Sequence, residues 1–278
     1  MNSCHIACFT PPLPDESCYS VLCRCLVRES VSSFRFELQM FNRQRDLSRL
    51  LYQPFRFEDL SRWFDDAESR QREYLDLHSV LQYRYPVLAE SARRLIRYWR
   101  DCHCLAVGEL KYLTRAIGFS HLPKQKLCYC NDCVDNDRKT YGETYWHLSH
   151  QLPAVVFCPI HETPIAVSDV PISSTRYELI PAEYILRKQA QKEVFRSQSP
   201  YDMNLSHDSM WMLYHGFEMD AVKLVMLMST LGENDLTKVL KEMQRYSNSI
   251  SALEYSNTEH FILLCRIIGI SPQSLVAN

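Results

Sequence analysis

Two short pairs of metal-ligating residues constrain the fold of this chain more than any other feature of its sequence. Cys130 and Cys133 are separated by two residues, and Cys158 and His161 repeat that spacing after a gap of 24 residues. Each pair brings two ligand atoms to one point, and two such pairs fill the four tetrahedral positions of a closed zinc site. We therefore predict one structural Zn²⁺ held by Cys130, Cys133, Cys158 and His161.

The predicted metal site is structural rather than catalytic. Four protein ligands leave no coordination position for the activated water that zinc hydrolases and deaminases need. The sequence also has no His-Glu-x-x-His motif and no zinc deaminase signature. Two alternatives stay open: Cys128 could replace Cys130 with a looser spacing to Cys133, and the cysteines could be buried without metal.

Further cysteine and histidine residues lie around this motif. Side chains of adjacent and alternate residues on a helix diverge around its axis, so we expect buried thiols rather than a second metal site upstream. The upstream group comprises Cys102, His103, Cys104, His121 and Cys128. Inside the motif, His147 and His150 lie three residues apart, and we expect them to order the loop around the zinc through hydrogen bonds.

The composition predicts a mostly α fold. The chain has 278 residues, of which 46% are hydrophobic and 12% aromatic, with only 6 glycines, as is typical of a compact helical protein rather than of disorder. This length exceeds the usual size of one domain. We expect an N-terminal, helix-turn-helix-like region over residues 1–125, a small zinc-ribbon-like element over 126–170 and a C-terminal helical bundle over 171–278.

Apolar periodicity predicts several helices in the N-terminal region. The first follows Pro14, with Asp15 and Ser17 as candidate caps. Its expected apolar face consists of Tyr19, Leu22, Cys23, Leu26 and Val27. Shorter helices are expected over 34–52 and from residue 58, and an amphipathic helix over 86–99.

The C-terminal region shows the same helical periodicity. Helices are expected over 180–195, from residue 205, and over 220–231, 235–245 and 258–268, with Gly232 and Gly269 at C-terminal caps. The last segment has the order of a helix-turn-helix. We expect it to be a structural pair of helices rather than a DNA reader.

The formal net charge is only -2, but basic residues concentrate in the N-terminal half. Residues 24–56 and 84–126 are net basic, and residues 201–260 are net acidic. A basic helical face is typical of phosphate contact and equally of a solvated surface. The candidate nucleic-acid-binding residues are Arg24, Arg28, Arg93, Arg94, Arg97 and Arg100.

The chain shows no sign of export. It contains no apolar run of roughly 20 residues, and its N-terminus lacks the basic start and apolar stretch of a signal peptide. Its twelve cysteines occur in metal-like spacings rather than in a short secreted chain. We therefore expect a cytoplasmic protein with reduced thiols and no membrane contact.

The segment from 130 to 164 resembles the zinc motif of the TniQ/TnsD family. In that motif a Cys-x-x-Cys pair precedes a Tyr-Gly-x-x-Tyr-Trp element, a His-Gln-Leu-Pro element and a Cys-Pro-x-His pair. The matching residues are Tyr141, Gly142, Tyr145, Trp146, His150, Gln151, Leu152, Pro153, Cys158, Pro159 and His161. The opening DESCYSVLCRCLVRES, with Arg24, and the later STRYELIPAEY are similar to family segments too, so the resemblance covers residues 11–185.

The resemblance implies a non-catalytic role in Tn7-like transposition. Such proteins mark the insertion site and recruit an AAA+ ATPase (TnsC-like), which in turn brings in the transposase. The expected partners are this ATPase, double-stranded DNA reached directly or through another protein, and in some elements a CRISPR RNA-guided, Cascade-like complex. A bacterial, nucleoid-associated location follows, and a homodimer stays open. The chain is shorter than TnsD-type members, which favours the adaptor role over an attachment-site reader.

Two other classes of function stay open from the residues alone. A stand-alone zinc-containing transcription regulator would use the arginine face of residues 86–99 and would bind DNA without a partner. A zinc hydrolase or nuclease would need an open metal position, which the four-ligand motif does not offer.

Overall fold

The computed structural model describes residues 10–29, 76–102, 107–117, 124–172, 178–188, 194–196, 201–219 and 257–276, with isolated positions between 223 and 241. The helices expected over 34–52 and from residue 58 lie outside the described residues. The same holds for nearly all of the helices expected over 220–231 and 235–245. His103, Cys104 and His121 also lie outside them.

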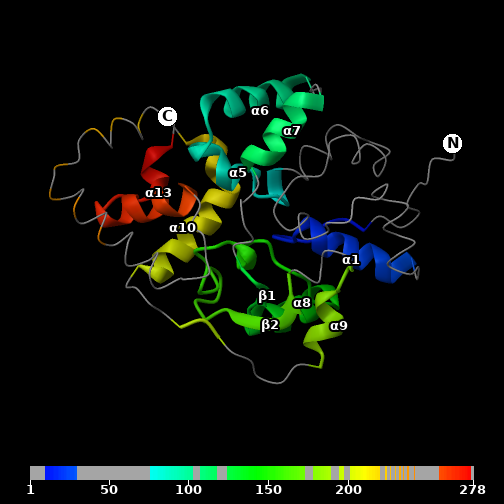
Figure 1. The fold of residues 1–278 in the computed structure, drawn as a ribbon. Helices are drawn as coiled ribbons and strands as arrows, with labels where there is room; N and C mark the ends of the chain where they lie inside the picture. The colour runs from blue at the N-terminus through cyan, green and yellow to red at the C-terminus, as the bar shows by residue number, and fades with distance from the viewer. Residues whose placement is uncertain are drawn as a thin grey trace.

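The described part of the chain is mostly helical, as the composition predicts (Figure 1). Its α-helices are α1 (Cys18–Glu29), α5 (Leu81–Arg84), α6 (Glu90–Cys102), α7 (Val107–Ile117), α8 (Asn131–Tyr141), α9 (Ala182–Leu186), α10 (Asp202–His215) and α13 (Asn257–Ile267). Single turns of 3-10 helix are η2 (Tyr85–Val87), η3 (Ser149–Gln151), η5 (Gly216–Glu218) and η6 (Pro272–Leu275). None of these helices is long and apolar enough to cross a membrane.

A two-stranded antiparallel sheet positions the two ligand pairs. Strand β1 (Lys126–Tyr129) pairs with β2 (Ala166–Pro171), and Tyr129 lies opposite Ala166. In an antiparallel pair the end of one strand meets the start of the next. The ligand pair that follows β1 and the pair that precedes β2 therefore emerge from the same end of the sheet.

Helix α1 is joined to the middle of the chain through Trp146. The Ser17 hydroxyl caps α1 by accepting a hydrogen bond from the Ser20 amide at 3.2 Å, as expected for an N-cap serine. The Ser20 hydroxyl accepts from the Trp146 amide at 3.0 Å, and the Trp146 indole donates to the Ile180 carbonyl at 2.8 Å. The predicted apolar face is buried except for Val27, which is 56% exposed.

A second layer forms around α10, which packs against α5 and α13. The buried Tyr83 hydroxyl of α5 contacts the Glu259 carboxylate of α13. Gly216 ends α10 where a side chain could not fit, because an added Cβ would lie 1.8 Å from the carbonyl oxygen of Gln82. This close approach fixes where α10 crosses α5.

Two expected helices differ from the structure in their extent, and one expected cap is confirmed. Helix α6 begins at Glu90 rather than at Pro86, because Leu88 is extended and interrupts the helix after η2. The helix expected over 180–195 was wrong at its end: α9 stops at Leu186, and Val194 pairs in an isolated bridge with Ala166. The cap at Gly269 is confirmed by its positive φ of 81°.

The apolar core of the described residues is continuous from α1 to the C-terminal η6. Contacts cross both expected domain boundaries, since α1 packs on the Trp146 segment and α10 lies against the loop before β2. The amide of Val156, for example, donates to the Ser206 hydroxyl at 3.3 Å. The segment that carries the two ligand pairs is thus embedded between the N- and C-terminal helices.

Candidate metal centre and its buried surroundings

The structure brings together the four residues that the spacing singled out. Cys130 directly follows β1 and precedes α8, and Cys133 lies in the first turn of that helix. Cys158 and His161 lie in a tight turn in which the Glu162 amide donates to the Cys158 carbonyl at 2.8 Å. The His161 amide also donates to the Cys158 sulfur at 3.4 Å, which favours its thiolate.

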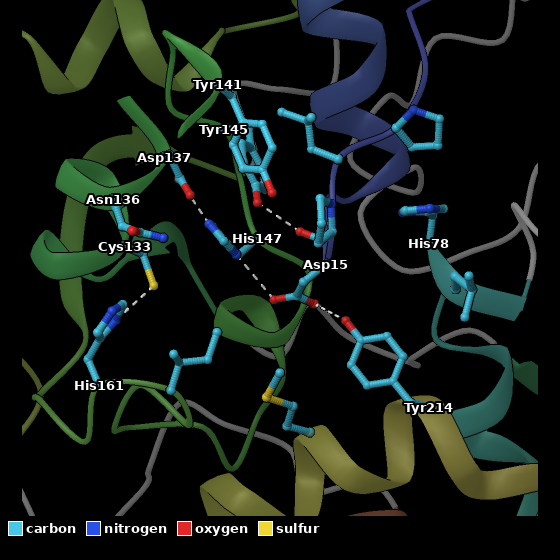
Figure 2. A pocket seen from close by; sticks show the side chains of 16 residues that line it. Asp15, His78, Cys133, Asn136, Asp137, Tyr141, Tyr145, His147, His161 and Tyr214 are labelled. Atoms are coloured by element: carbon cyan, nitrogen blue, oxygen red, sulfur yellow. Dashed lines mark hydrogen bonds and ion pairs between the residues drawn. The ribbon is translucent and has the colours of Figure 1, made fainter. Parts of the chain in front are cut away.

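These four residues, which we call the metal cluster, have the separations of a compact coordination site. Their ligand atoms all lie within 4.8 Å of one another. The Cys133 sulfur is 3.2 Å from Nδ1 of His161 (Figure 2). It is also 3.6 Å from the Cys158 sulfur. Nδ1 of His161 is also 3.6 Å from the Cys158 sulfur and 3.7 Å from the Cys130 sulfur. The cluster can therefore hold one metal ion.

The short distances between the three thiols favour the binding of a cation at the metal cluster. Hydrogen bonds from the thiols of Cys133 and Cys158 lower the pKa of Cys130. The contact with Cys130 raises the pKa of Cys133 and raises that of Cys158 to about 11. Three thiols this close cannot all ionise without a positive charge between them, and a metal ion supplies that charge.

Polar groups behind the cluster hold its ligands in place. The Thr163 hydroxyl donates to the Asp132 carboxylate at 2.9 Å and lies 3.3 Å from the Cys130 sulfur. Nε2 of His150 lies 3.8 Å from the Cys133 sulfur, in line with the expected supporting role of that histidine. Cys128, the alternative ligand, lies outside the cluster, and its thiol donates to the Lys126 carbonyl at 3.3 Å.

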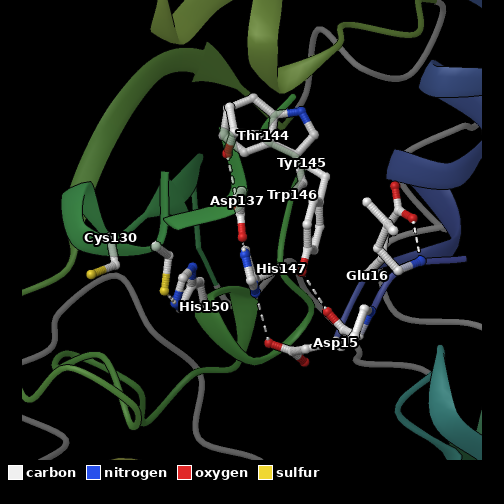
Figure 3. Close-up of polar contacts among 12 residues, drawn as sticks. Asp15, Glu16, Cys130, Asp137, Thr144, Tyr145, Trp146, His147 and His150 are labelled. Atoms are coloured by element: carbon white, nitrogen blue, oxygen red, sulfur yellow. Dashed lines mark hydrogen bonds and ion pairs between the residues drawn. The ribbon is translucent and has the colours of Figure 1, made fainter. Parts of the chain in front are cut away.

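A buried histidine between two carboxylates lies next to the metal cluster (Figure 3). Nε2 of His147 is 3.0 Å from the Asp137 carboxylate, and Nδ1 is 3.3 Å from that of Asp15. Burial alone would lower the pKa of His147, but hydrogen bonds to Asp137 and Asp15 outweigh it and raise the pKa to about 9. We call these three residues the carboxylate-histidine network.

The network ties the N-terminus to the rest of the fold. The Asp15 carboxylate accepts hydrogen bonds from the Ser149 amide at 3.0 Å, the Ser149 hydroxyl at 2.5 Å and the Tyr214 hydroxyl of α10 at 2.9 Å. Burial would raise the pKa of Asp15, but the hydrogen bond and charge of His147 hold it below its ordinary value. Asp15 was a candidate cap of α1. Its carboxylate instead caps η3, because it accepts the hydrogen bond from the amide of Ser149, the first residue of η3.

A pocket of about 580 Å³ opens beside this network (Figure 2). The N-terminal loop, α8 and the irregular segment after it, the Cys-His turn and α10 all contribute to its wall. Its polar lining residues include Asp15, His78, Asn136, Asp137, Tyr145, His147, His161 and Tyr214. Burial and the charge of His147 lower the pKa of the adjacent His150 to about 3, so the network holds the only charged imidazole of this histidine pair at neutral pH.

The expected nucleic-acid-binding arginines fall into two groups. Arg24 is buried, and its guanidinium pairs with the Glu16 carboxylate at 2.7 Å and with that of Glu143 at 3.0 Å. Arg28, one turn further along α1, pairs with Glu143 at 3.2 Å but remains half exposed. Arg24 thus lies inside the fold, whereas Arg28 reaches solvent.

The other four arginines lie on α6. Arg93, Arg94 and Arg97, which we call the arginine face, all pair with the single carboxylate of Glu90, at 2.9, 3.3 and 2.6 Å. The side chain of Arg94 is 75% exposed and that of Arg97 is 51% exposed. Arg100 pairs with Asp76 at 3.2 Å and stacks over the ring of Phe217. The arginine face therefore carries three positive charges against one negative charge.

Several residues of this region could not be assigned from the sequence. Asp15 and Asp137 are 122 positions apart, and no spacing rule connects them. Lys124 belongs to the net basic segment 84–126, yet it is buried and its ammonium donates to the carbonyls of His150 at 2.7 Å and Val155 at 2.6 Å. A lone lysine before a buried strand carries no sequence signal for such a role.

One of two comparisons with known proteins identifies the family of this chain. No curated protein matches the chain. The family model TniQ matches residues 7–165, which are more than half of the chain and include α1, the carboxylate-histidine network and the metal cluster. The chain therefore belongs to the TniQ family, which serves target-site selection in Tn7-like transposition.

Proposed function

We propose that this protein is an adaptor that links target DNA, or a DNA-bound guide complex, to the AAA+ ATPase of a Tn7-like transposon. The observation that carries the proposal is the TniQ match over residues 7–165. The ATPase then recruits the transposase, so the bond-breaking chemistry belongs to another protein. We place the protein in the bacterial cytoplasm, in association with the nucleoid.

We propose that the metal cluster binds one zinc ion. With zinc-sulfur bonds of about 2.3 Å and zinc-nitrogen bonds of about 2.0 Å, a tetrahedral site has ligand separations of roughly 3.5–3.8 Å. The separations of 3.6 Å between Cys133 and Cys158 and of 3.6 Å between Cys158 and His161 match this geometry, and the 3.2 Å between Cys133 and His161 would lengthen slightly around an ion. Three thiolates and one imidazole also form a donor set that suits zinc.

The role of this zinc would be structural. Four protein ligands close the coordination sphere, so no position is left for a reactive water. The ligands come from the end of β1, from α8 and from the turn before β2. The metal would therefore cross-link the segments that carry Trp146 and the carboxylate-histidine network, and hold α1 and α10 on either side of them.

We further propose that the exposed arginines contact the DNA backbone. Arg94 and Arg97 on α6 and Arg28 on α1 reach solvent, and their guanidinium groups suit phosphate. Arg93 and Arg100 are less exposed and would support these contacts. The buried Arg24 would not touch DNA and would contribute by stabilising the fold. Such contacts would position the protein without reading a sequence.

The test is co-purification of the tagged protein with the products of its neighbouring genes, with protein bands, nucleic-acid absorbance and zinc content measured together. An AAA+ ATPase in the preparation would support the adaptor, and guide RNA with it would identify a CRISPR-linked system. Recovery of the ATPase with one specific DNA site and no RNA would favour the attachment-site reader. Recovery of duplex DNA without any protein partner would favour the transcription regulator.

A further inference from the structure

The pocket beside the carboxylate-histidine network has an apolar rim that the fold does not cover. Leu77, Tyr141 and Ile160 all line it, and they are 36%, 41% and 55% exposed. They come from three separate segments: the helical residues before α5, the end of α8 and the Cys-His turn. Exposed apolar side chains that converge on one hollow are typical of a protein interaction site.

The charge inside this pocket is negative. The carboxylates of Asp15 and Asp137 pair with the imidazole of His147, so the network carries a net charge of about -1 even when that imidazole is protonated. Two other histidines line the pocket: Nδ1 of His78 lies 2.8 Å from the Glu16 carbonyl, and His161 belongs to the metal cluster. None of the described residues that line the pocket is a lysine or an arginine. A phosphate group would be repelled from it, and a cationic group would be attracted.

The occupied oxygens of Asp15 and the apolar rim of the pocket together restrict what this cation can be. The Asp15 oxygens already accept bonds from Ser149 and Tyr214, so they contribute charge rather than free coordination positions for a bare ion. The rim offers apolar contact through Leu77, Tyr141 and Ile160. A lysine or arginine side chain satisfies both conditions, because its aliphatic stem packs on apolar surface while its head keeps polar contact.

We propose that this pocket is a docking site for the AAA+ ATPase, which inserts a lysine or arginine side chain from an otherwise apolar segment. The stem of that side chain packs against Ile160 and Tyr141, and its head lies near the Asn136 amide and the carboxylate-histidine network. This inference rests on the proposed function, because it takes the ATPase as the partner. It assigns that contact to a surface separate from the arginine face.

A charge series at Asn136 tests the electrostatic part. Asn136 is exposed and lines the pocket, so its side chain can change with little effect on the fold. Asn136→Lys should weaken binding of the full-length protein to the purified ATPase about threefold, and Asn136→Asp should strengthen it about threefold. The two shifts should shrink at high salt. Equal affinities for both variants would overturn the proposal.

A second pair of variants tests the apolar rim. Ile160→Arg places a cation at the mouth of the pocket and should weaken ATPase binding about tenfold. Val194→Arg is the matched control, because Val194 is 42% exposed and lies outside the pocket. Zinc content and thermal unfolding are measured on each protein, so that damage to the neighbouring Cys-His turn is recognised.

The outcomes separate this inference from the proposed function. If the wild-type protein binds the ATPase and the Asn136 and Ile160 variants bind equally well, the pocket is not the contact and the adaptor function stands. If the wild-type protein does not bind the ATPase, the adaptor function and this inference are both overturned. Should Ile160→Arg lose its zinc, a photo-crosslinker at Tyr141 decides: crosslinks next to a lysine or arginine of the ATPase support the pocket, and their absence overturns it.

Discussion

In both the metal cluster and the arginine face, groups that carry like charge when ionised lie close together. The two sites differ in what balances that charge. In the cluster, three thiols and an imidazole converge within 4.8 Å, and no cation among the described residues lies between them. On α6, three guanidinium groups converge on the carboxylate of Glu90, which partly neutralises them. All three thiols of the cluster can ionise only beside an external cation, which we propose to be zinc, whereas the guanidinium groups of the arginine face are charged without a ligand.

The largest effect that this comparison predicts is the loss of a cluster ligand. Cys133→Ala should abolish zinc retention and expose the chain to proteolysis, because structural zinc sites contribute on the order of 10 kcal/mol to folding. Zinc content and limited proteolysis measure the two effects. Cys265→Ala is the matched control, since Cys265 is a buried thiol outside the cluster. A metal-loaded, protease-resistant Cys133→Ala protein would remove the zinc assignment.

The next largest predicted effect is a difference in the free energy of unfolding between variants of a buried and of an exposed arginine. Arg24→Ala leaves the fully buried Glu16 carboxylate without its ion-pair partner and should reduce the free energy of unfolding by about 3 kcal/mol. Arg94→Ala removes an exposed partner of Glu90 and should leave thermal unfolding nearly unchanged. Urea denaturation of the two variants provides the comparison. An Arg24→Ala protein as stable as the wild type would show that Arg24 does not stabilise the fold.

The sequence predicted the metal cluster because local spacing encodes local geometry. Two residues between ligands suffice to bring their side chains together. The two pairs, 24 residues apart, meet because β1 before the first pair and β2 after the second form one antiparallel sheet. No spacing rule predicts the carboxylate-histidine network, because Asp15 and Asp137 reach His147 from opposite sides through the packing of the N-terminal segment on the Trp146 segment. The same limit applies to Arg24, whose burial depends on Glu143, a residue 119 positions away.

The carboxylate-histidine network should give the protein a pH-dependent stability. The pKa of His147 is about 9 in the fold and about 6.5 in an unfolded chain, so its contribution is complete below pH 6.5. It should be lost as the pH rises from 6.5 through 9, at up to about 1.4 kcal/mol per pH unit. The difference in unfolding free energy between the wild type and His147→Asn measures it. A difference that stays constant from pH 6.5 to 9.5 would contradict the charged imidazole.

The smallest predicted effects belong to the arginine face, where stability and DNA binding should separate. Replacing Arg93, Arg94 and Arg97 with alanine should weaken binding to duplex DNA about tenfold and lower the salt slope by roughly two to three, because each phosphate contact releases counterions. Glu90→Gln should act in the opposite direction, since it frees the same three guanidinium groups from their shared carboxylate. Fluorescence anisotropy at two salt concentrations measures both variants, and thermal unfolding should show little change in either. If the DNA affinity responds to neither substitution, the arginine face is a solvated surface, and phosphate contact must lie elsewhere in the chain.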